Sequence, residues 1–106
     1  MATVKINFEV ELQNLPTDME KIYLVGNDNK LGAWNPEEAV ALKRTKTSPI
    51  YKGFRSIEEG TIIEFKVLKE QNWDTVEKGA GFEETTNRVL TVKTPKTVKI
   101  TVQNWK

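Results

Sequence analysis

Apolar and polar side chains alternate along most of this chain, and this period of two constrains its fold more than any other feature. In the first segment, apolar residues occupy positions 4, 6, 8, 10 and 12, with polar or charged residues between them. A β-strand points successive side chains to opposite faces, so the pattern is typical of a strand with one buried face. Alternation and short apolar runs predict strands over residues 4–12, 21–25, 50–57, 61–68, 73–77, 88–93 and 98–102.

Turn-forming residues separate these strands. The segment Glu58-Glu59-Gly60 predicts a tight turn that makes 61–68 the antiparallel partner of 50–57. Asn35 before Pro36 can cap a single helical turn, too short to count as a helix of the fold. A chain of 106 residues has room for one core, so we expect a single domain over residues 1–106. About seven short strands without a convincing helix predict an all-β sandwich or barrel.

The chain contains no histidine and no cysteine, which excludes several classes of chemistry. Zinc sites of Cys and His, Ser-His-Asp triads, Cys-His dyads, iron–sulfur centres and thiol redox chemistry all require one of the two residues. Neither serine, Ser48 or Ser56, lies in a Gly-x-Ser-x-Gly motif. We therefore expect no enzymatic activity, no cofactor and no metal site.

Positive and negative charges nearly cancel, because 16 Lys and Arg face 15 Asp and Glu, for a net charge of +1. Such a chain has no overall field to hold a polyanion, so no nucleic-acid partner is expected. Lys93, Lys96 and Lys99 are better explained as residues that keep a strand edge from pairing with other molecules. No apolar run approaches the roughly 18–20 residues that cross a bilayer, so no membrane partner is expected either.

The first residues alternate and do not form the apolar core of a signal peptide. The chain is therefore either cytoplasmic or a segment of a longer secreted chain, and the sequence does not choose between these two alternatives.

Three groups of residues are candidates for a binding function. The first is Trp34, which lies between Gly32 and Pro36 in a predicted loop. Such an indole either fills the core or forms an exposed platform, and the polar residues 27–29 and Asn35 around it favour a platform for a sugar. An indole stacks on the apolar C–H face of a pyranose while amides and charges bond its hydroxyls.

The second candidate is segment 72–88, which holds Trp73, Phe82, four carboxylates and two amides. A glycosidase needs two carboxylates held roughly 5–5.5 Å or 6.5–9.5 Å apart, and nothing in the segment sets such a separation. The spacing of its oxygen ligands matches no EF-hand loop. Both a ligand-binding loop and a solvated acidic loop are compatible with this composition.

The third candidate is Lys66. Alternation over 61–68 places it on the face opposite Ile63, Phe65 and Val67. A single lysine on a strand is normally solvated, so it bears on function only if Trp34 and segment 72–88 converge beside it.

The order and spacing of several motifs resemble those of the family 20 carbohydrate-binding modules, the starch-binding domains. The resemblance covers almost the whole chain and implies an immunoglobulin-like antiparallel β-sandwich of about seven to eight strands, which binds α-1,4-glucans and has no catalytic activity of its own. The motifs that carry it are Ile22-Tyr23-Leu24-Val25-Gly26, Leu31-Gly32-Ala33-Trp34, Ala39-Val40-Ala41-Leu42, Glu58-Glu59-Gly60-Thr61-Ile62-Ile63-Glu64-Phe65-Lys66, Phe82-Glu83-Glu84-Thr85-Thr86-Asn87-Arg88 and the terminal Trp105.

The resemblance also implies a first binding site. The family's ligand-binding positions fall on Trp34, Lys66, Phe82 and Asn87, with Glu83 beside them. Phe82 stands where the family has a second Trp, which is a departure from its pattern.

Trp73 is the other candidate for the second stacking ring, with Glu77 near it. The form Trp-Asp-Thr-Val-Glu-Lys-Gly in this segment resembles versions of the module that are found beside esterase-type and other hydrolase domains. The family's second site uses three aromatic residues, of which only Tyr51 has a counterpart here. Its loop positions fall around Asp18 and Thr45-Lys46, so we expect no working second site and a partly buried Tyr51.

The sequence therefore predicts a non-catalytic module that binds starch, maltooligosaccharides or cyclodextrin at one site. Trp34 and either Trp73 or Phe82 stack on successive sugars, while Lys66 and Asn87 bond their hydroxyls. Two rings bury little area, so we expect micromolar to millimolar affinity. The family resemblance implies a monomeric module covalently linked to a catalytic domain, outside the cell or at its surface.

The alternative is a structural or interdomain sandwich that has lost glucan binding and packs against a catalytic partner. An exposed Trp34 or Trp73 serves equally well as the anchor of such an interface.

Overall fold

The structure is a computed structural model and describes residues 2–13, 15, 19–44 and 48–105. Three single turns of 3-10 helix lie between its strands, at η1 (Asn29–Leu31), η2 (Pro36–Glu38) and η3 (Trp73–Thr75). In the described ranges no α-helix occurs, and no helical segment is long and apolar enough to cross a membrane. The strands there are β1 (Thr3–Leu12), β2 (Lys21–Gly26), β3 (Val40–Arg44), β4 (Ile50–Glu58), β5 (Ile62–Leu68), β6 (Glu77–Lys78), β7 (Arg88–Thr91), β8 (Lys96–Val102) and β9 (Asn104–Trp105).

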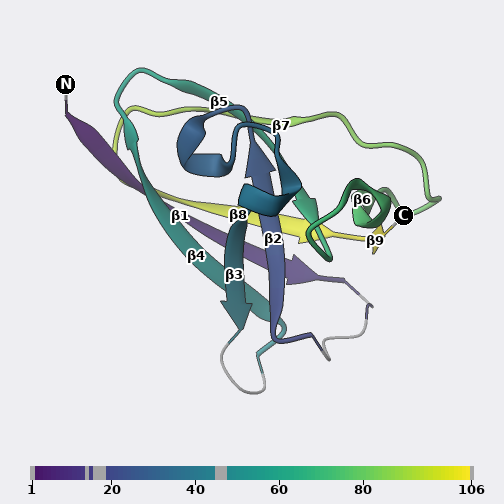
Figure 1. Cartoon of the computed structure of the whole chain (residues 1–106). Coiled ribbons are helices and arrows are strands. Elements are labelled where there is room, and N and C mark those ends of the chain that lie inside the picture. The colour runs from purple at the N-terminus through teal and green to yellow at the C-terminus, as the bar shows by residue number, and fades with distance from the viewer. Residues whose placement is uncertain (1, 14, 16–18, 45–47, 106) are drawn as a thin grey trace.

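Seven strands form one curled sheet in the order β7-β5-β2-β3-β4-β1-β8, and β6 pairs with β9 in a separate small ribbon (Figure 1). Among the described residues, two pairs link β3 and β4 in register, Lys43 with Lys52 and Arg44 with Tyr51. The sheet folds over at this link, so that β7, β5, β2 and β3 form one layer and β4, β1 and β8 form the other. The predicted all-β sandwich is therefore confirmed.

The core lies between the two layers and consists of the inward faces of the alternating strands. Phe8 of β1 meets Phe65 of β5 edge to face, with ring centroids 5.5 Å apart. Along β1 the buried side chains fall at every second position, as the alternation predicts. Lys96 and Lys99 are exposed on β8, which forms one edge of the sheet. The buried cluster comprises Val4, Ile6, Phe8, Val10, Leu12, Ile22, Leu24, Leu31, Val40, Leu42, Tyr51, Ile57, Ile63, Phe65, Val67, Val92, Ile100 and Val102.

One predicted strand direction and one predicted strand pairing are wrong. First, β8 runs parallel to β1, so the sheet is mixed where an entirely antiparallel one was expected. Second, β5 pairs with β2 and β7 and does not pair with β4. The turn after β4 crosses between the layers, because Glu59 N–H donates to Ala2 O (2.9 Å) and Gly60 N–H donates to Val92 O (2.7 Å). Gly60 adopts a φ of 93°, which lets the chain make this crossing.

The predicted strand over 73–77 is also wrong for most of its length. Residues Trp73–Thr75 form the helical turn η3, and only Glu77 and Lys78 pair with β9. The Thr75 hydroxyl accepts a hydrogen bond from Glu70 N–H (2.9 Å) and closes the loop in this compact form. By contrast, the single turn at Pro36 forms as expected, since Asn35 Oδ1 accepts the N–H of Glu37 (3.1 Å).

Removal of the Phe8 ring should test the core. We expect Phe8→Ala to lower the free energy of unfolding by about 3–5 kcal/mol, because Phe8 is fully buried and its loss leaves a cavity. Phe54→Ala is the matched control and should cost about 1 kcal/mol or less, since Phe54 is 52% exposed and contacts Lys5 at the surface. Urea denaturation measures both values. Equal losses in the two variants would contradict the assignment of Phe8 to the core.

Candidate functional site

Trp34 projects from a tightly wound loop between β2 and β3. Three successive residues, Gly32, Ala33 and Trp34, have positive φ values of 89°, 50° and 63°. A left-handed conformation costs roughly 1–2 kcal/mol for a residue other than glycine, so hydrogen bonds must hold it. Ala33 N–H donates to Asp28 O (3.1 Å) and Trp34 N–H donates to Gly26 O (2.8 Å). The loop thereby fixes the direction of a half-buried indole that is not part of the core cluster.

The polar residues around Trp34 build this loop. Asp28 Oδ1 accepts Lys30 N–H (2.8 Å) and so caps η1, as Asn35 caps η2. Asn27 Oδ1 accepts a backbone N–H of β5 at Glu64 (3.0 Å). The sequence suggested that these side chains bond a sugar, but they satisfy backbone groups and do not line the pocket described below.

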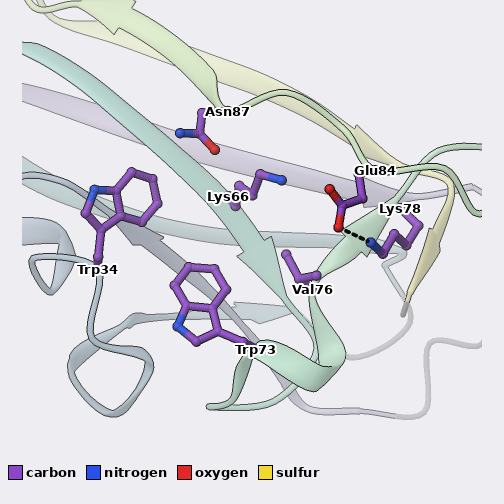
Figure 2. A pocket seen from close by; sticks show the side chains of 7 residues that line it. All are labelled: Trp34, Lys66, Trp73, Val76, Lys78, Glu84 and Asn87. Atoms are coloured by element: carbon purple, nitrogen blue, oxygen red, sulfur yellow. Dashed lines mark hydrogen bonds and ion pairs between the residues drawn. The ribbon is translucent and has the colours of Figure 1, made fainter.

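Trp73 lies on η3, directly beside Trp34. Its exposed fraction is 40%. The centroids of the two indoles are 6.1 Å apart and their planes are tilted by 40° (Figure 2). Gln71 Nε2 donates to Glu37 O (3.1 Å) and thus ties the loop of Trp73 to the loop that follows Trp34. The two rings are therefore held together by contacts between loops that are far apart in the sequence.

The two indoles form one side of an open pocket of about 390 Å³. Lys66 of β5 and Asn87 lie across from them (Figure 2). Lys66 Nζ donates one hydrogen bond to Thr85 O (2.6 Å), and Asn87 Nδ2 donates to Glu64 Oε1 (3.3 Å). An ammonium has three donors and an amide has two donors and an acceptor, so both groups keep hydrogen-bonding capacity for a ligand. The pocket thus combines apolar ring faces with a few polar groups, as small-ligand sites do.

Four of the residues singled out from sequence line this pocket, namely Trp34, Lys66, Trp73 and Asn87, and Phe82 and Glu83 do not. Phe82 lies in the loop that follows β6, where it is 67% exposed and has a φ of 63°. Glu83 turns back on its own loop, and its Oε2 accepts Gly81 N–H (2.8 Å).

Three further pocket residues, Val76, Lys78 and Glu84, were not singled out. Lys78 Nζ and Glu84 Oε1 are 3.4 Å apart, with the lysine side chain 10% exposed and the glutamate 87% exposed. Alternation could have indicated Val76 and Lys78 from the sequence. Both are neighbours of Glu77, so in an extended segment their side chains point to the face opposite that of Glu77. Glu84 lies in the segment flagged as a candidate loop, but only the fold brings it to Lys78.

Glu77 itself does not line the pocket, although it was expected near the second ring. It is 1% exposed, and its Oε1 lies 2.6 Å from Arg88 Nη2. Burial of a carboxylate is costly without a partner of opposite charge, and Arg88 is that partner for Glu77.

Tyr51, the remaining aromatic residue of the family's second site, is fully buried, and its hydroxyl donates to Met19 O (2.6 Å). It was expected to be partly buried and instead has no ring face in solvent. The associated positions at Asp18 and Thr45-Lys46 lie outside the described residues. Within the described ranges, no group of three or more acidic, Cys or His residues is placed to hold a metal ion.

Fold and pocket together define a small β-sandwich with an open pocket lined by aromatic residues. Residues 3–102 match the model of the starch binding domain, family 20 of the carbohydrate-binding modules. The chain therefore belongs to the starch-binding domain family.

Relatives and solved structures agree with this assignment. The chain is 38% identical over 66 residues to a glucan 1,4-alpha-maltotetraohydrolase of Roseateles saccharophilus, covering 61% of this chain and 12% of that enzyme. It is 33% identical over 108 residues to an amylopullulanase of Thermoanaerobacter thermohydrosulfuricus, covering 97% of this chain and 7% of that enzyme. The chain thus spans a small part of these curated relatives.

Among solved structures, the family 20 module of a maltotetraose-forming amylase from Pseudomonas saccharophila superposes with a TM-score of 0.67. The match is 27% identical and covers 92% of this chain and 99% of that module. The glucoamylase of Hormoconis resinae superposes with a TM-score of 0.74 at 24% identity. This match covers 97% of this chain and 18% of the glucoamylase, and it supports the fold.

Two glycine substitutions, one in the Trp34 loop and one in the turn after β4, separate the cost of backbone conformation from that of crowding. Gly60→Ala should lower the free energy of unfolding by about 1–2 kcal/mol, because its φ is 93° but a Cβ meets no atom within 4 Å. Gly32→Ala should cost more, since a Cβ there also comes within 2.8 Å of Glu38 O. Urea denaturation and tryptophan fluorescence compare the two variants. An equal cost, with tryptophan emission unchanged in Gly32→Ala, would contradict this account of the loop.

Proposed function

We propose that this chain is a non-catalytic module that binds α-1,4-glucans at the pocket of Trp34 and Trp73. The observation that carries the proposal is the pair of indoles 6.1 Å apart beside Lys66 and Asn87. Each ring offers an apolar face to one sugar of a linear or cyclic maltooligosaccharide, and the lysine and amide bond sugar hydroxyls. Trp73 takes the part of the second ring, because it lines the pocket and Phe82 does not.

The tilt of the two rings also supports a glucan ligand. Planes inclined by 40° offer two faces that are not parallel, which suits sugars that turn relative to one another along the chain. The pocket is open and offers two rings for stacking, so binding buries little area and should be weak, in the micromolar to millimolar range.

The starch-degrading relatives support an accessory role. The two curated relatives are longer enzymes, of which this chain covers 12% and 7%. We propose that the chain belongs to a larger protein, in which it is covalently linked to a catalytic domain and holds it near an α-glucan.

Alanine substitutions of the rings test the site. Trp34→Ala and Trp73→Ala should each weaken binding of maltoheptaose or β-cyclodextrin by more than about tenfold, which corresponds to about 1.4 kcal/mol. Phe82→Ala should change it less than about threefold. Isothermal titration calorimetry measures the affinities, and Phe54→Ala, an exposed aromatic on the other layer, is the matched control. A larger loss in Phe82→Ala than in Trp73→Ala would reverse the assignment of the second ring.

The competing function is an interdomain contact without sugar binding, and the 67% exposed Phe82 favours it. Indole fluorescence of the isolated chain distinguishes the two. A glucan ligand should shift the emission of the wild type in a saturable way and should have a much smaller effect on Trp34→Ala at the same concentrations. An unchanged wild-type spectrum at millimolar β-cyclodextrin would remove starch-type glucans as ligands and favour the interface.

A further inference from the structure

A buried carboxylate lies beneath the pocket and joins the segments that form it. Glu77 is 1% exposed, and its two oxygens accept three hydrogen bonds. Oε2 accepts Val67 N–H (2.9 Å) and Arg88 Nε (3.1 Å), while Oε1 accepts Arg88 Nη2 (2.6 Å). These charge-assisted bonds are stronger than neutral ones, and Arg88 binds through a two-point fork that limits its orientation.

Each member of this network is next in sequence to a residue that lines the pocket. Lys66 precedes Val67, and Asn87 precedes Arg88. Val76 and Lys78 flank Glu77 on either side. Neighbouring side chains of an extended chain project to opposite faces, so Glu77 and Arg88 point away from the pocket that their neighbours line. Val67 contributes its backbone N–H from the strand that carries Lys66. Glu77 therefore joins the segment of Lys78 to those of Lys66 and Asn87, which the pairing of Phe65 with Arg88 also holds side by side.

The network also connects the pocket to the other layer of the sandwich. Arg88 Nη2 donates a further hydrogen bond to Thr101 O of β8 (3.0 Å). β6 pairs with the two-residue strand β9, and its Lys78 also forms a single bridge with Glu84. A ribbon this short is marginal without added contacts. Trp73 lies on η3 just before β6, so the anchor holds one end of the segment that carries this ring, while Thr75 and Gln71 make its other contacts.

We propose that Glu77 is a positioning residue for the glucan site, acting through Arg88 and Val67 and without touching the sugar. The inference rests on the proposed function of the pocket. Loss of the carboxylate should let the segment from Trp73 to Lys78 move relative to Lys66 and Asn87, so that the rings and the polar groups no longer meet one ligand together.

Glu77→Gln tests this inference, because it keeps the shape of the side chain and removes the charge and one acceptor oxygen. We expect maltoheptaose binding at least tenfold weaker than in the wild type by calorimetry. The matched control, Glu11→Gln, removes a carboxylate from the exposed face of β1 and should bind within about twofold of the wild type. Amide NMR spectra of core residues report whether each variant is folded.

A second readout does not require sugar. Two indoles 6.1 Å apart and tilted by 40° should give an exciton couplet in the circular dichroism spectrum, which Trp34→Ala abolishes. We expect Glu77→Gln to reduce the couplet while the core amide signals persist, and Glu11→Gln to leave it unchanged. If the wild type shows the couplet but binds no glucan, the proposed function fails while the couplet still tests the role of Glu77.

Arg88→Lys covers the case in which Glu77→Gln does not fold. It keeps the positive charge beside Glu77 but loses the two-point fork and the bond to Thr101 O. We expect a folded variant with a reduced couplet and binding weakened severalfold. A folded Glu77→Gln with unchanged couplet and affinity would overturn the inference. Failure of both variants to fold would also overturn it, because the network would then serve the whole fold.

Discussion

The contact between the two sheet layers is the interaction on which the rest of this structure depends. Phe8 of β1 and Phe65 of β5 meet at its centre, and the apolar faces of the other strands pack around them. Burial of these faces sets where the outward faces lie. Since Lys66 follows Phe65 on β5, the residue that anchors the core also determines that the lysine projects away from it, into the pocket.

The pocket itself is formed by irregular segments on this frame. Trp34 is held in a left-handed conformation by backbone hydrogen bonds to Gly26 and to residues of its own loop, and Trp73 lies on a single helical turn. Such segments bury few apolar groups, so polar contacts decide their shape. The Gln71 bond to Glu37 O and the Glu77 network supply such contacts, and under the proposed function they arrange the rings before a ligand arrives. Preorganisation of this kind lowers the entropy that binding costs.

Local pattern predicted much of the fold and a part of the candidate site. The buried positions of β1 and the outward direction of Lys66 follow from alternation alone, and the turn at Pro36 follows from its cap. Strand partners did not follow, because the turn at Gly60 looks like a hairpin turn but carries the chain between layers. Glu77 was misplaced for a similar reason, since its burial depends on Arg88, eleven residues away.

The sequence by itself determined the class of fold, the absence of His and Cys chemistry and the aromatic and polar residues available for a site. These depend on the identity and spacing of neighbouring residues, which act over a few positions of the chain. Only the tertiary structure decided that β5 joins β2 and β7, and that Trp73 lies beside Trp34 while Phe82 lies outside the pocket. Those outcomes depend on hydrogen bonds and packing between segments far apart in the chain, whose geometry no local pattern contains.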